Sequence, residues 1–491
     1  MKGFKSLEEV NLDVENICKN NSCNDNWKLN YHFETPIGLI NDPNGLSYYN
    51  GEYHMFFQWN PYGCEHKFKH WGLVKTKDFV NYTVPKLVLA PTDWYDKNGC
   101  YSGSGLEVDG KLELLYTGNV KDEEGNRESY QCRAVCDEEG NITKFGPVVS
   151  DKDRPEGYTA HFRDPKAFKK GDKYYFVIGV QTNDLIGRAL LYSSDDFKEW
   201  KLEGEIDTEY KNFGFMWECP GICEVDGTDV FIFSPQGLEK EEFKNQNIYQ
   251  SGYLLGKLDY DTLKFSHNEF KELDMGFDFY APQTFNDEKG RTIMIGWMGM
   301  PEEEEYHPTS KYDRMHCLTM ARELSVKDGV LYQNPIEEYK SLRGETLAQL
   351  EDVMGSQWAS HNIEENSYEL LLDINKNEAS ELQLRFAAGE EEYTLFTYDF
   401  VQNIAILDRT NMKNGDKGVR KLKLDETEDV KIHMFMDNSA VEIYLNDGKE
   451  VLSARLYPEE GSAGLQLLSK GGNIKINNMK VFKLEGVKYN G

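Results

Sequence analysis

The stretch LINDPNGLSYYNGEYHMFFQ, residues 39–58, contains the pattern that decides the fold. An acid, Asp42, lies in a turn rich in Pro and Gly, ahead of a short apolar run, and a second turn, Asn-Gly, leads into a richly apolar run. Two short strands joined by a tight Gly turn form a β-hairpin. Turn chemistry accounts for the Pro-Asn-Gly triplet, but it does not account for an acid at the mouth of a strand.

The same pattern occurs five times along the chain. The other copies begin YSGSGLEVDG at Tyr101, RDPKAFKKGD at Arg163, ECPGICEVDG at Glu218 and YAPQTFNDEKG at Tyr280. Counted from Asp42, Ser102, Asp164, Glu218 and Ala281, the openings recur every 54 to 63 residues, which leaves room for two further strands in each copy. Four strands in each of five copies predict a five-bladed β-propeller.

The pattern changes after about residue 335. The segment 336–360 is expected to be an irregular or partly helical connector, and from Tyr368 on apolar and polar residues alternate in short runs between turn residues. Such runs predict a C-terminal β-sandwich. Near the N-terminus, Ser6 and Glu9 form a possible capping box, which predicts a short helix. The predicted organisation is all-β, with an N-terminal helical extension (1–27), a propeller domain (28–335), a linker (336–360) and a sandwich (361–491).

Three of the five copies carry an acid at their opening. The innermost strand of each blade lines the channel of a propeller, so Asp42, Asp164 and Glu218 are expected to meet at one end of it. Burying an acid is costly, and three acids together are better explained by chemistry than by structure. Two carboxylates that flank a bond are the usual equipment of a glycosidase. A non-catalytic sugar-binding propeller that uses the same acids as hydrogen-bond acceptors is the alternative.

The local sequence predicts different surroundings for the three carboxylates. Asp42 lies in a turn, where backbone N–H groups can hold a charged carboxylate. Glu218 lies in FMWECPG, whose apolar side chains solvate a charge poorly and are expected to raise the pKa of the carboxyl group. Asp164 follows Arg163, and the adjacent cation is expected to keep it ionised.

Composition excludes several function classes. The formal net charge of −30 argues against general nucleic-acid binding and against adsorption to an anionic membrane. No apolar run approaches the ~20 residues of a membrane span, and the N-terminal stretch has no apolar core of a signal peptide, which predicts a cytoplasmic protein. The sequence contains no P-loop, dinucleotide fingerprint, zinc-protease motif or nucleophile elbow, and it carries no signal for an oligomeric state.

Several motifs resemble those of one enzyme family. NDPNG, FRDPK and WECPG, in this order and spacing, resemble the β-fructofuranosidases of glycoside hydrolase family 32, and so do YSGSG, FYAPQTF, IGWM and DNSAVEIYLNDG with ARLYP. The resemblance covers about residues 28–485. It implies a propeller followed by a sandwich and retaining hydrolysis of a small sugar substrate, with no metal and no cofactor.

The resemblance also implies residue roles. Asp42 would be the nucleophile that forms a covalent fructosyl-enzyme, Glu218 the general acid/base, and Asp164 the stabiliser of the transition state. The residues expected to shape the fructose site are Asn41, Gln58, Tyr101, Ser102, Arg163, Tyr280 and Trp297. Leu39 departs from the family pattern, because many members carry Trp there.

The loop PYGCEHKFKHW, residues 61–71, carries His66 where many invertases have Trp, and its basic character resembles the sucrose-6-phosphate hydrolases of the family. A protein with a charge of −30 repels a dianionic substrate unless its cleft is locally positive. The candidate phosphate contacts are His66, Lys67, Lys69 and Arg127. The expected substrate is therefore sucrose 6-phosphate or sucrose, and the alternative is a cytoplasmic β-fructosidase of fructo-oligosaccharides or fructans.

Overall fold

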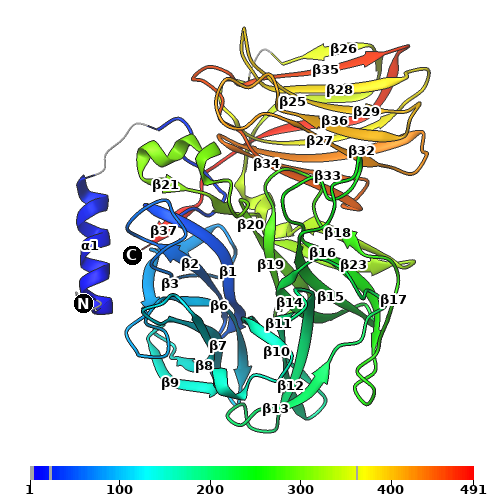
Figure 1. Cartoon of the computed structure of the whole chain (residues 1–491). Coiled ribbons are helices and arrows are strands. Elements are labelled where there is room, and N and C mark those ends of the chain that lie inside the picture. The colour runs from blue at the N-terminus through cyan, green and yellow to red at the C-terminus, as the bar shows by residue number, and fades with distance from the viewer. Residues whose placement is uncertain (1–4, 21–24, 361–362, 491) are drawn as a thin grey trace.

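The computed structural model describes residues 5–20, 25–360 and 363–490, and in this part of the chain strands dominate. They form seven sheets, accompanied by one α-helix, α1 (Leu7–Asn20), so the predicted all-β class is confirmed. Figure 1 shows a body built from the N-terminal strands, a layered unit built from the C-terminal strands above it, and α1 along one side.

Five of the sheets follow one another along residues 38–335. In each of them the strands pair antiparallel in sequence order. The first strands are β1 (Gly38–Tyr49), β6 (Cys100–Val108), β10 (Tyr158–Lys170), β14 (Met216–Val225) and β19 (Tyr280–Asn286), and the second strands are β2 (Glu52–Asn60), β7 (Lys111–Lys121), β11 (Lys173–Thr182), β15 (Thr228–Gln236) and β20 (Thr292–Met298). The third strands are β3 (His70–Thr76), β8 (Arg127–Cys136), β12 (Gly187–Ser194), β16 (Gly252–Leu258) and β23 (Arg322–Lys327), and the fourth are β4 (Asn81–Thr83), β9 (Ile142–Val149), β13 (Lys201–Glu205), β17 (Phe265–His267) and β24 (Val330–Pro335).

The first strands contact one another in a ring. β1 contacts β6, β6 contacts β10, β10 contacts β14, β14 contacts β19, and β19 contacts β1. Figure 1 shows these strands around a common centre. The turns that join first and second strands use the predicted chemistry, because Asn50, Asp109 and Asp226, each followed by Gly, have φ of 50°, 50° and 48°. Such left-handed pairs match the twist of a two-residue hairpin.

Each first strand is irregular near its start. The pairing register shifts between Ile40 and Pro43, Cys100 and Gly103, Arg163 and Lys166, Glu218 and Gly221, and Tyr280 and Gln283. A β-bulge bends its strand and re-aims a side chain, and bulges are frequent beside active sites. Asp42 therefore lies inside β1 at such a shift, which corrects the expected turn ahead of the strand.

The C-terminal strands form two six-stranded sheets that share a core containing Tyr368, Leu384, Phe396 and Met434. The strand order of one sheet is β25 (Arg343–Gly355), β36 (Ile474–Leu484), β27 (Ser367–Asn375), β32 (Asp429–Asp437), β33 (Ala440–Leu445) and β34 (Glu450–Arg455). The order of the other is β26 (Gln357–Ala359), β35 (Gly464–Lys470), β28 (Glu381–Ala388), β29 (Thr394–Asp399), β30 (Ile404–Asp408) and β31 (Val419–Lys423).

The segment 336–360 corrects the expected connector. Only Glu337–Leu342 is helical, as a 3₁₀ turn, whereas β25 pairs with β36 and β26 pairs with β35. β25 is the edge strand of its sheet and is largely exposed. Because an edge strand buries little, its sequence lacks the alternation that identified the other strands, and pairing with β36 decides its conformation.

Short strands complete the N-terminal sheets. β21 (Arg314–Met315) pairs parallel with β1, and β37 (Lys488–Asn490) pairs parallel with β4, so the end of the described chain returns to the first sheet. The remaining short strands are β5 (Lys86–Leu89), β18 (Lys271–Glu272) and β22 (Cys317–Leu318), which pair with β3, β16 and β20.

Helix α1 begins with the predicted capping box. The Ser6 N–H donates to Glu9 Oε2 at 2.7 Å, and the Glu9 N–H donates to Ser6 Oγ at 3.2 Å, which satisfies two backbone donors at the helix start. Val10 and Val14 are buried in the core of the first sheet. The Asn11 side chain bonds both the N–H and the C=O of Leu87 in β5, so the helix is fixed to the body.

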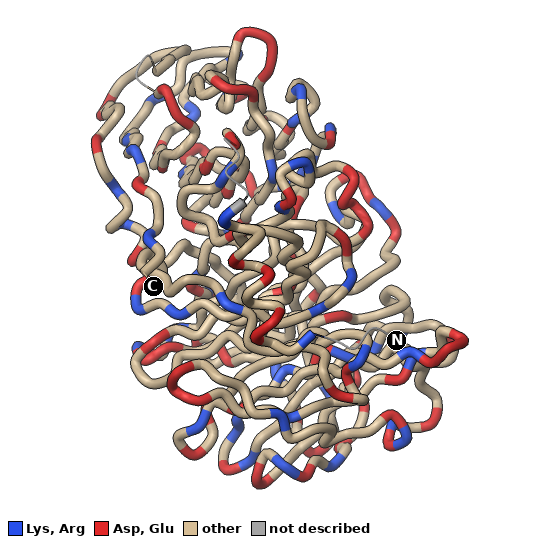
Figure 2. The backbone as a smooth tube through the Cα atoms, turned by 90° about the vertical axis from the view of Figure 1, so that its left-hand side faces the viewer, with Lys and Arg blue, Asp and Glu red and all other residues tan. Residues whose placement is uncertain are grey.

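Charge is spread over the whole molecule. Figure 2, which views the protein from the side of α1, shows acidic and basic residues interspersed over both parts of the chain. None of the helices in the described ranges has the length and apolarity that crossing a membrane requires.

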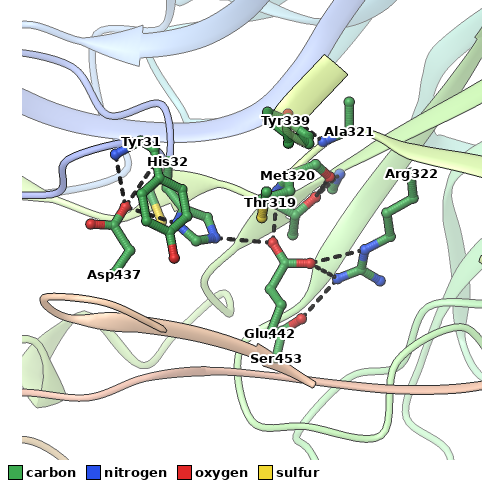
Figure 3. Close-up of polar contacts among 12 residues, drawn as sticks. Tyr31, His32, Thr319, Met320, Ala321, Arg322, Tyr339, Asp437, Glu442 and Ser453 are labelled. Atoms are coloured by element: carbon green, nitrogen blue, oxygen red, sulfur yellow. Dashed lines mark hydrogen bonds and ion pairs between the residues drawn. The ribbon is translucent and has the colours of Figure 1, made fainter. Parts of the chain in front are cut away.

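A buried ionic network joins the two parts of the molecule (Figure 3). His32 lies between two acids of the C-terminal sheet, with Nδ1 2.9 Å from Asp437 Oδ2 and Nε2 3.1 Å from Glu442 Oε1. Arg322 of β23 donates to Glu442 Oε2 at 2.7 Å and to Asp274 Oδ2 at 3.0 Å. All five side chains are fully buried. Removing one partner would leave a buried charge uncompensated, so the network fixes how the two parts dock.

This network predicts that stability falls at alkaline pH. Burial lowers the pKa of His32, but its hydrogen bonds to Asp437 and Glu442 outweigh burial and raise the pKa from 6.5 to about 9. Because the folded pKa is above the unfolded one, the stabilisation is present in full below pH 6.5 and is lost as pH rises through about 9. We expect a loss of up to roughly 3 kcal/mol from this group, seen as a falling melting temperature. His32→Gln should flatten this dependence, and His267→Gln, at a half-buried histidine at the end of β17, should not. Equal slopes in all three proteins would contradict the assignment.

Candidate active site

The structure brings the three predicted acids together through one residue, Cys219. The Cys219 thiol sulfur lies 3.7 Å from Asp42 Oδ2 and 3.7 Å from Asp164 Oδ2, and the Cys219 N–H donates to Asp164 Oδ2 at 3.1 Å. Glu218 precedes Cys219, at the register shift of β14. Cys219 and Asp164 both have positive φ, 47° and 66°. The bulges therefore aim acids from β1, β10 and β14 at one place on the axis of the ring.

Side chains, and not the backbone N–H groups expected from the sequence, hold Asp42. Asn41 Nδ2 donates to Asp42 Oδ1 at 2.9 Å, and the Ser102 hydroxyl donates to Asp42 Oδ2. Asn41 is itself fixed, because its Nδ2 also donates to Gln58 Oε1 at 2.8 Å and its Oδ1 accepts from Lys69 Nζ at 2.5 Å. The carboxylate thus has a defined orientation, which is what a nucleophile requires.

Glu218 accepts hydrogen bonds from three side chains. Arg163 donates to Oε1 through Nη2 at 2.5 Å and Nε at 3.1 Å, whereas the Tyr280 hydroxyl (2.8 Å) and Gln236 Nε2 (3.0 Å) donate to Oε2. Burial raises the pKa of Glu218, but the Arg163 charge and these donors outweigh burial, and the pKa is lowered. The predicted rise was wrong, because Trp217 points into the core and leaves these polar groups around the carboxylate.

Asp164 is the acid whose pKa is raised. It is 6% exposed, and burial, with the negative charges of Glu218 and Asp42, outweighs the opposing charge of Arg163 and raises its pKa from 3.8 to about 7. The prediction that Arg163 keeps it ionised was wrong, because the guanidinium is directed at Glu218 and its Nε stays 4.0 Å from Asp164 Oδ2. The raised pKa of Asp164 and the lowered pKa of Glu218 therefore favour a proton on Asp164 up to about neutral pH.

Aromatic residues surround this cluster. Trp297 is fully buried, with its ring centroid 6.3 Å from that of Tyr280 and 5.5 Å from that of His66. Its indole N–H has no acceptor among the described residues. Tyr101 is partly exposed beside Ser102. Flat, partly polar side chains of this kind suit the ring of a sugar. Leu39, in contrast, is fully buried in β1.

Lys69 was predicted as a phosphate contact, and in the structure its ammonium group is directed at Asn41. It is 6% exposed, and its ammonium group bonds Asn41, the residue that orients Asp42. Burial lowers the pKa of Lys69 from 10.5 to about 8. Lys69 therefore supports the nucleophile, a position that the basic composition of the loop did not reveal.

The other three candidates for phosphate binding differ in their partners. His66 Nε2 lies 2.8 Å from Glu304 Oε1, and exposed Lys67 pairs with Glu65 at 2.7 Å. Arg127 has no acidic partner in the part of the chain that the structure describes, and its guanidinium lies over the Tyr101 ring at 5.9 Å.

Three site residues were missed from the sequence. Gln236 donates to Glu218, Thr117 Oγ1 accepts from the Asp164 N–H at 3.0 Å, and His161 Nδ1 lies 2.8 Å from Arg163 Nη1. A signal existed for two of them, because Thr117 and Gln236 lie toward the end of the second strand in their copies, as Gln58 does in the first. Comparing equivalent positions of the copies would have found them.

Comparisons with known proteins match both parts of the chain. Residues 32–335 match the model described as Glycosyl hydrolases family 32 N-terminal domain, and residues 338–483 match Glycosyl hydrolases family 32 C terminal. A sucrose-6-phosphate hydrolase of Bacillus subtilis is 43% identical over 89% of this chain and 90% of that protein, and one of Staphylococcus xylosus is 37% identical over 94% and 93%. The solved sucrose-6-phosphate hydrolase of Lactobacillus gasseri has a TM-score of 0.90 at 31% identity, covering 99% of this chain and 98% of that one.

Proposed function

The chain belongs to glycoside hydrolase family 32, and from that membership we propose that it is a retaining enzyme that cleaves the β-fructofuranoside bond of sucrose 6-phosphate to fructose and glucose 6-phosphate. Its activity is that of a β-fructofuranosidase. The observation that carries the proposal is the oriented Asp42 carboxylate beside Asp164 and Glu218, each acid with its own set of donors. Relatives that are named for this substrate and are 31–43% identical to the chain support the phosphorylated sugar.

The proposed reaction has two steps. Asp42, oriented by Asn41 and Ser102, attacks the anomeric carbon of the fructosyl ring while Glu218 gives its proton to the glycosidic oxygen. That bond breaks, glucose 6-phosphate leaves, and the fructosyl group is bound to Asp42. Glu218 then takes a proton from water, which attacks the same carbon, releases fructose and restores Asp42.

The proton changes its place when substrate binds. In the free protein Arg163 bonds Glu218 and the raised pKa puts the proton on Asp164. Fructosyl hydroxyl groups can accept hydrogen bonds from Arg163 and donate hydrogen bonds to Asp164. The bonds donated to Asp164 stabilise its ionised carboxylate, so its pKa falls. Glu218 then loses the hydrogen bonds from Arg163 that lowered its pKa. It therefore takes up the proton that Asp164 gives up, next to the glycosidic oxygen. Asp164 and Arg163 thus act together as the stabilisers of the sugar.

This arrangement predicts the alkaline side of the pH profile. The required form of the cluster carries one proton, and that proton is lost as pH rises through about 7, the raised pKa of Asp164. We expect kcat/KM for sucrose 6-phosphate to fall tenfold per pH unit above that value. Initial rates between pH 5 and 9 measure this. A rate that is constant up to pH 9 would contradict the shared proton.

A substrate panel tests the proposed function. We expect kcat/KM to be about 10- to 100-fold higher for sucrose 6-phosphate than for sucrose, since a charged phosphate contact contributes roughly 1.5–3 kcal/mol. Kestose, inulin and levan should be poorer than either. A preference for kestose or inulin would instead indicate a fructan β-fructosidase, and sugar binding without release of fructose would indicate a binding protein.

The proposal also covers the arrangement of the five N-terminal sheets and the start of the sandwich. We propose that the five sheets are the blades of a closed five-bladed propeller, residues 28–335, since their first strands contact in a ring. The sandwich then begins with β25 at Arg343, earlier than the sequence indicated. A cytoplasmic location stays a prediction.

A further inference from the structure

A basic pocket lies beside the catalytic acids. Its volume is about 590 Å³, and five lysines contribute to its lining: Lys5, Lys67, Lys69, Lys97 and Lys121. His66, His70 and Tyr101 line it as well, and none of the described residues that line it is acidic. The protein as a whole has a net charge of −30, whereas the lining of this pocket is positively charged. A concave surface with positive charge attracts negatively charged ligands.

The pocket shares its wall with the active site. Tyr101 precedes Ser102, whose hydroxyl donates to Asp42. Lys69 also lines the pocket, and its ammonium group bonds Asn41, the residue that orients Asp42. The pocket therefore adjoins the acids through Tyr101 and Lys69, on the side where the other half of a substrate bound at Asp42 would have to lie.

Two of the lysines have no counter-charge. Lys97 and Lys121 make no ion pair or side-chain hydrogen bond with any residue that the structure describes, whereas Lys67 pairs with Glu65 and Lys5 with Asp13.

Asn98 joins the elements that carry the two unpaired lysines. Its Oδ1 accepts from the Lys121 N–H at 2.6 Å, and its N–H donates to the Asn119 C=O at 3.0 Å. The turn that carries Lys97 is thereby tied to the end of β7, which carries Lys121. Like charges fixed on adjoining elements repel each other, and an anion between them removes that repulsion.

We propose that this pocket binds the phosphate group on the glucosyl side of the substrate, with Lys97 and Lys121 as its contacts. The proposal rests on the proposed function and adds residues that lie outside the basic loop 61–71. Val10 of α1 and Lys5, just before the helix, also line the pocket, so in this proposal the N-terminal helix contributes to the substrate site.

The test is the double variant Lys97→Gln/Lys121→Gln. We expect its kcat/KM for sucrose 6-phosphate to fall about 10- to 100-fold, with the loss mostly in KM, and its kcat/KM for sucrose to change by about threefold or less. The matched control is Lys111→Gln/Lys198→Gln, which removes the same charge at two exposed, unpaired lysines outside the pocket. Equal losses with both substrates, or no selective loss, would overturn the proposal.

Inhibition of sucrose hydrolysis separates a sugar phosphate from free phosphate. Glucose 6-phosphate should inhibit the wild type more strongly than glucose or inorganic phosphate, and the double variant should lose that difference. Inorganic phosphate that inhibits as strongly as glucose 6-phosphate would overturn the assigned ligand. If the wild type does not cleave sucrose 6-phosphate, the proposed function fails, and calorimetry with glucose 6-phosphate then decides the pocket alone. Binding that the double variant loses supports the pocket, and absence of binding to the wild type overturns it.

Discussion

Asp42→Ala is expected to lower kcat/KM for sucrose 6-phosphate by roughly 10³-fold or more, because no covalent intermediate can form without its carboxylate. The neighbouring donors Asn41 and Ser102 remain in this variant, and only the short side chain of Asp42 is truncated. The melting temperature should therefore stay close to that of the wild type. Fructose release under initial-rate conditions measures the loss. Activity within tenfold of the wild type would exclude Asp42 as the nucleophile.

Two comparisons make this result specific. Ser102→Ala removes one donor to Asp42 but keeps the carboxylate, so its loss should be smaller, about tenfold. Azide added to Asp42→Ala can occupy the space of the lost carboxylate and attack from its side of the sugar. The product should then be the α-fructofuranosyl azide, with inverted configuration. A β-azide from this variant would place the nucleophile elsewhere.

Glu218→Ala is expected to cost about as much, roughly 10³-fold, because the glucosyl oxygen then leaves without a proton. The loss comes from the missing protonation of the leaving oxygen. With a substrate whose leaving group needs no proton, kcat/KM of the variant should therefore fall far less. p-Nitrophenyl β-fructofuranoside provides that comparison. The pH dependence above pH 7 should also disappear, since the proton donor is gone.

The matched control for Glu218 is Gln236→Ala, which removes one of the donors to Glu218 Oε2 and keeps the acid. Its effect should be a modest shift of the pH profile and no change in the dependence on leaving group. Equal losses of Glu218→Ala on both leaving groups would show that Glu218 positions the sugar and does not transfer the proton.

The sequence predicted the hairpins and the meeting of the acids because both depend on local chemistry. Gly turns at a regular spacing mark hairpins, and a repeated unit puts equivalent positions at equivalent places. The strand β25 was missed for the opposite reason, since an exposed edge strand has no alternation of its own and forms through its partner β36. The short strand β37 likewise depends on β4, far away in the sequence.

The protonation of the acids could not be predicted from neighbours in the sequence. Arg163 adjoins Asp164 in the chain, yet its guanidinium reaches across to Glu218 on another strand. The pKa of Asp164 is therefore raised and that of Glu218 lowered, the reverse of the expectation. Lys69 shows the same limit, because the composition of its loop predicted a phosphate contact and could not show that its ammonium group bonds Asn41.

The most direct test of a double displacement at Asp42 is the configuration of the fructose first released from sucrose 6-phosphate. NMR at low temperature, with the anomeric carbon of the fructosyl group labelled, can record it before the sugar equilibrates. Two successive displacements at that carbon predict β-fructofuranose as the initial product. Initial α-fructofuranose would show a single displacement by water, and it would contradict the covalent intermediate on which this mechanism depends.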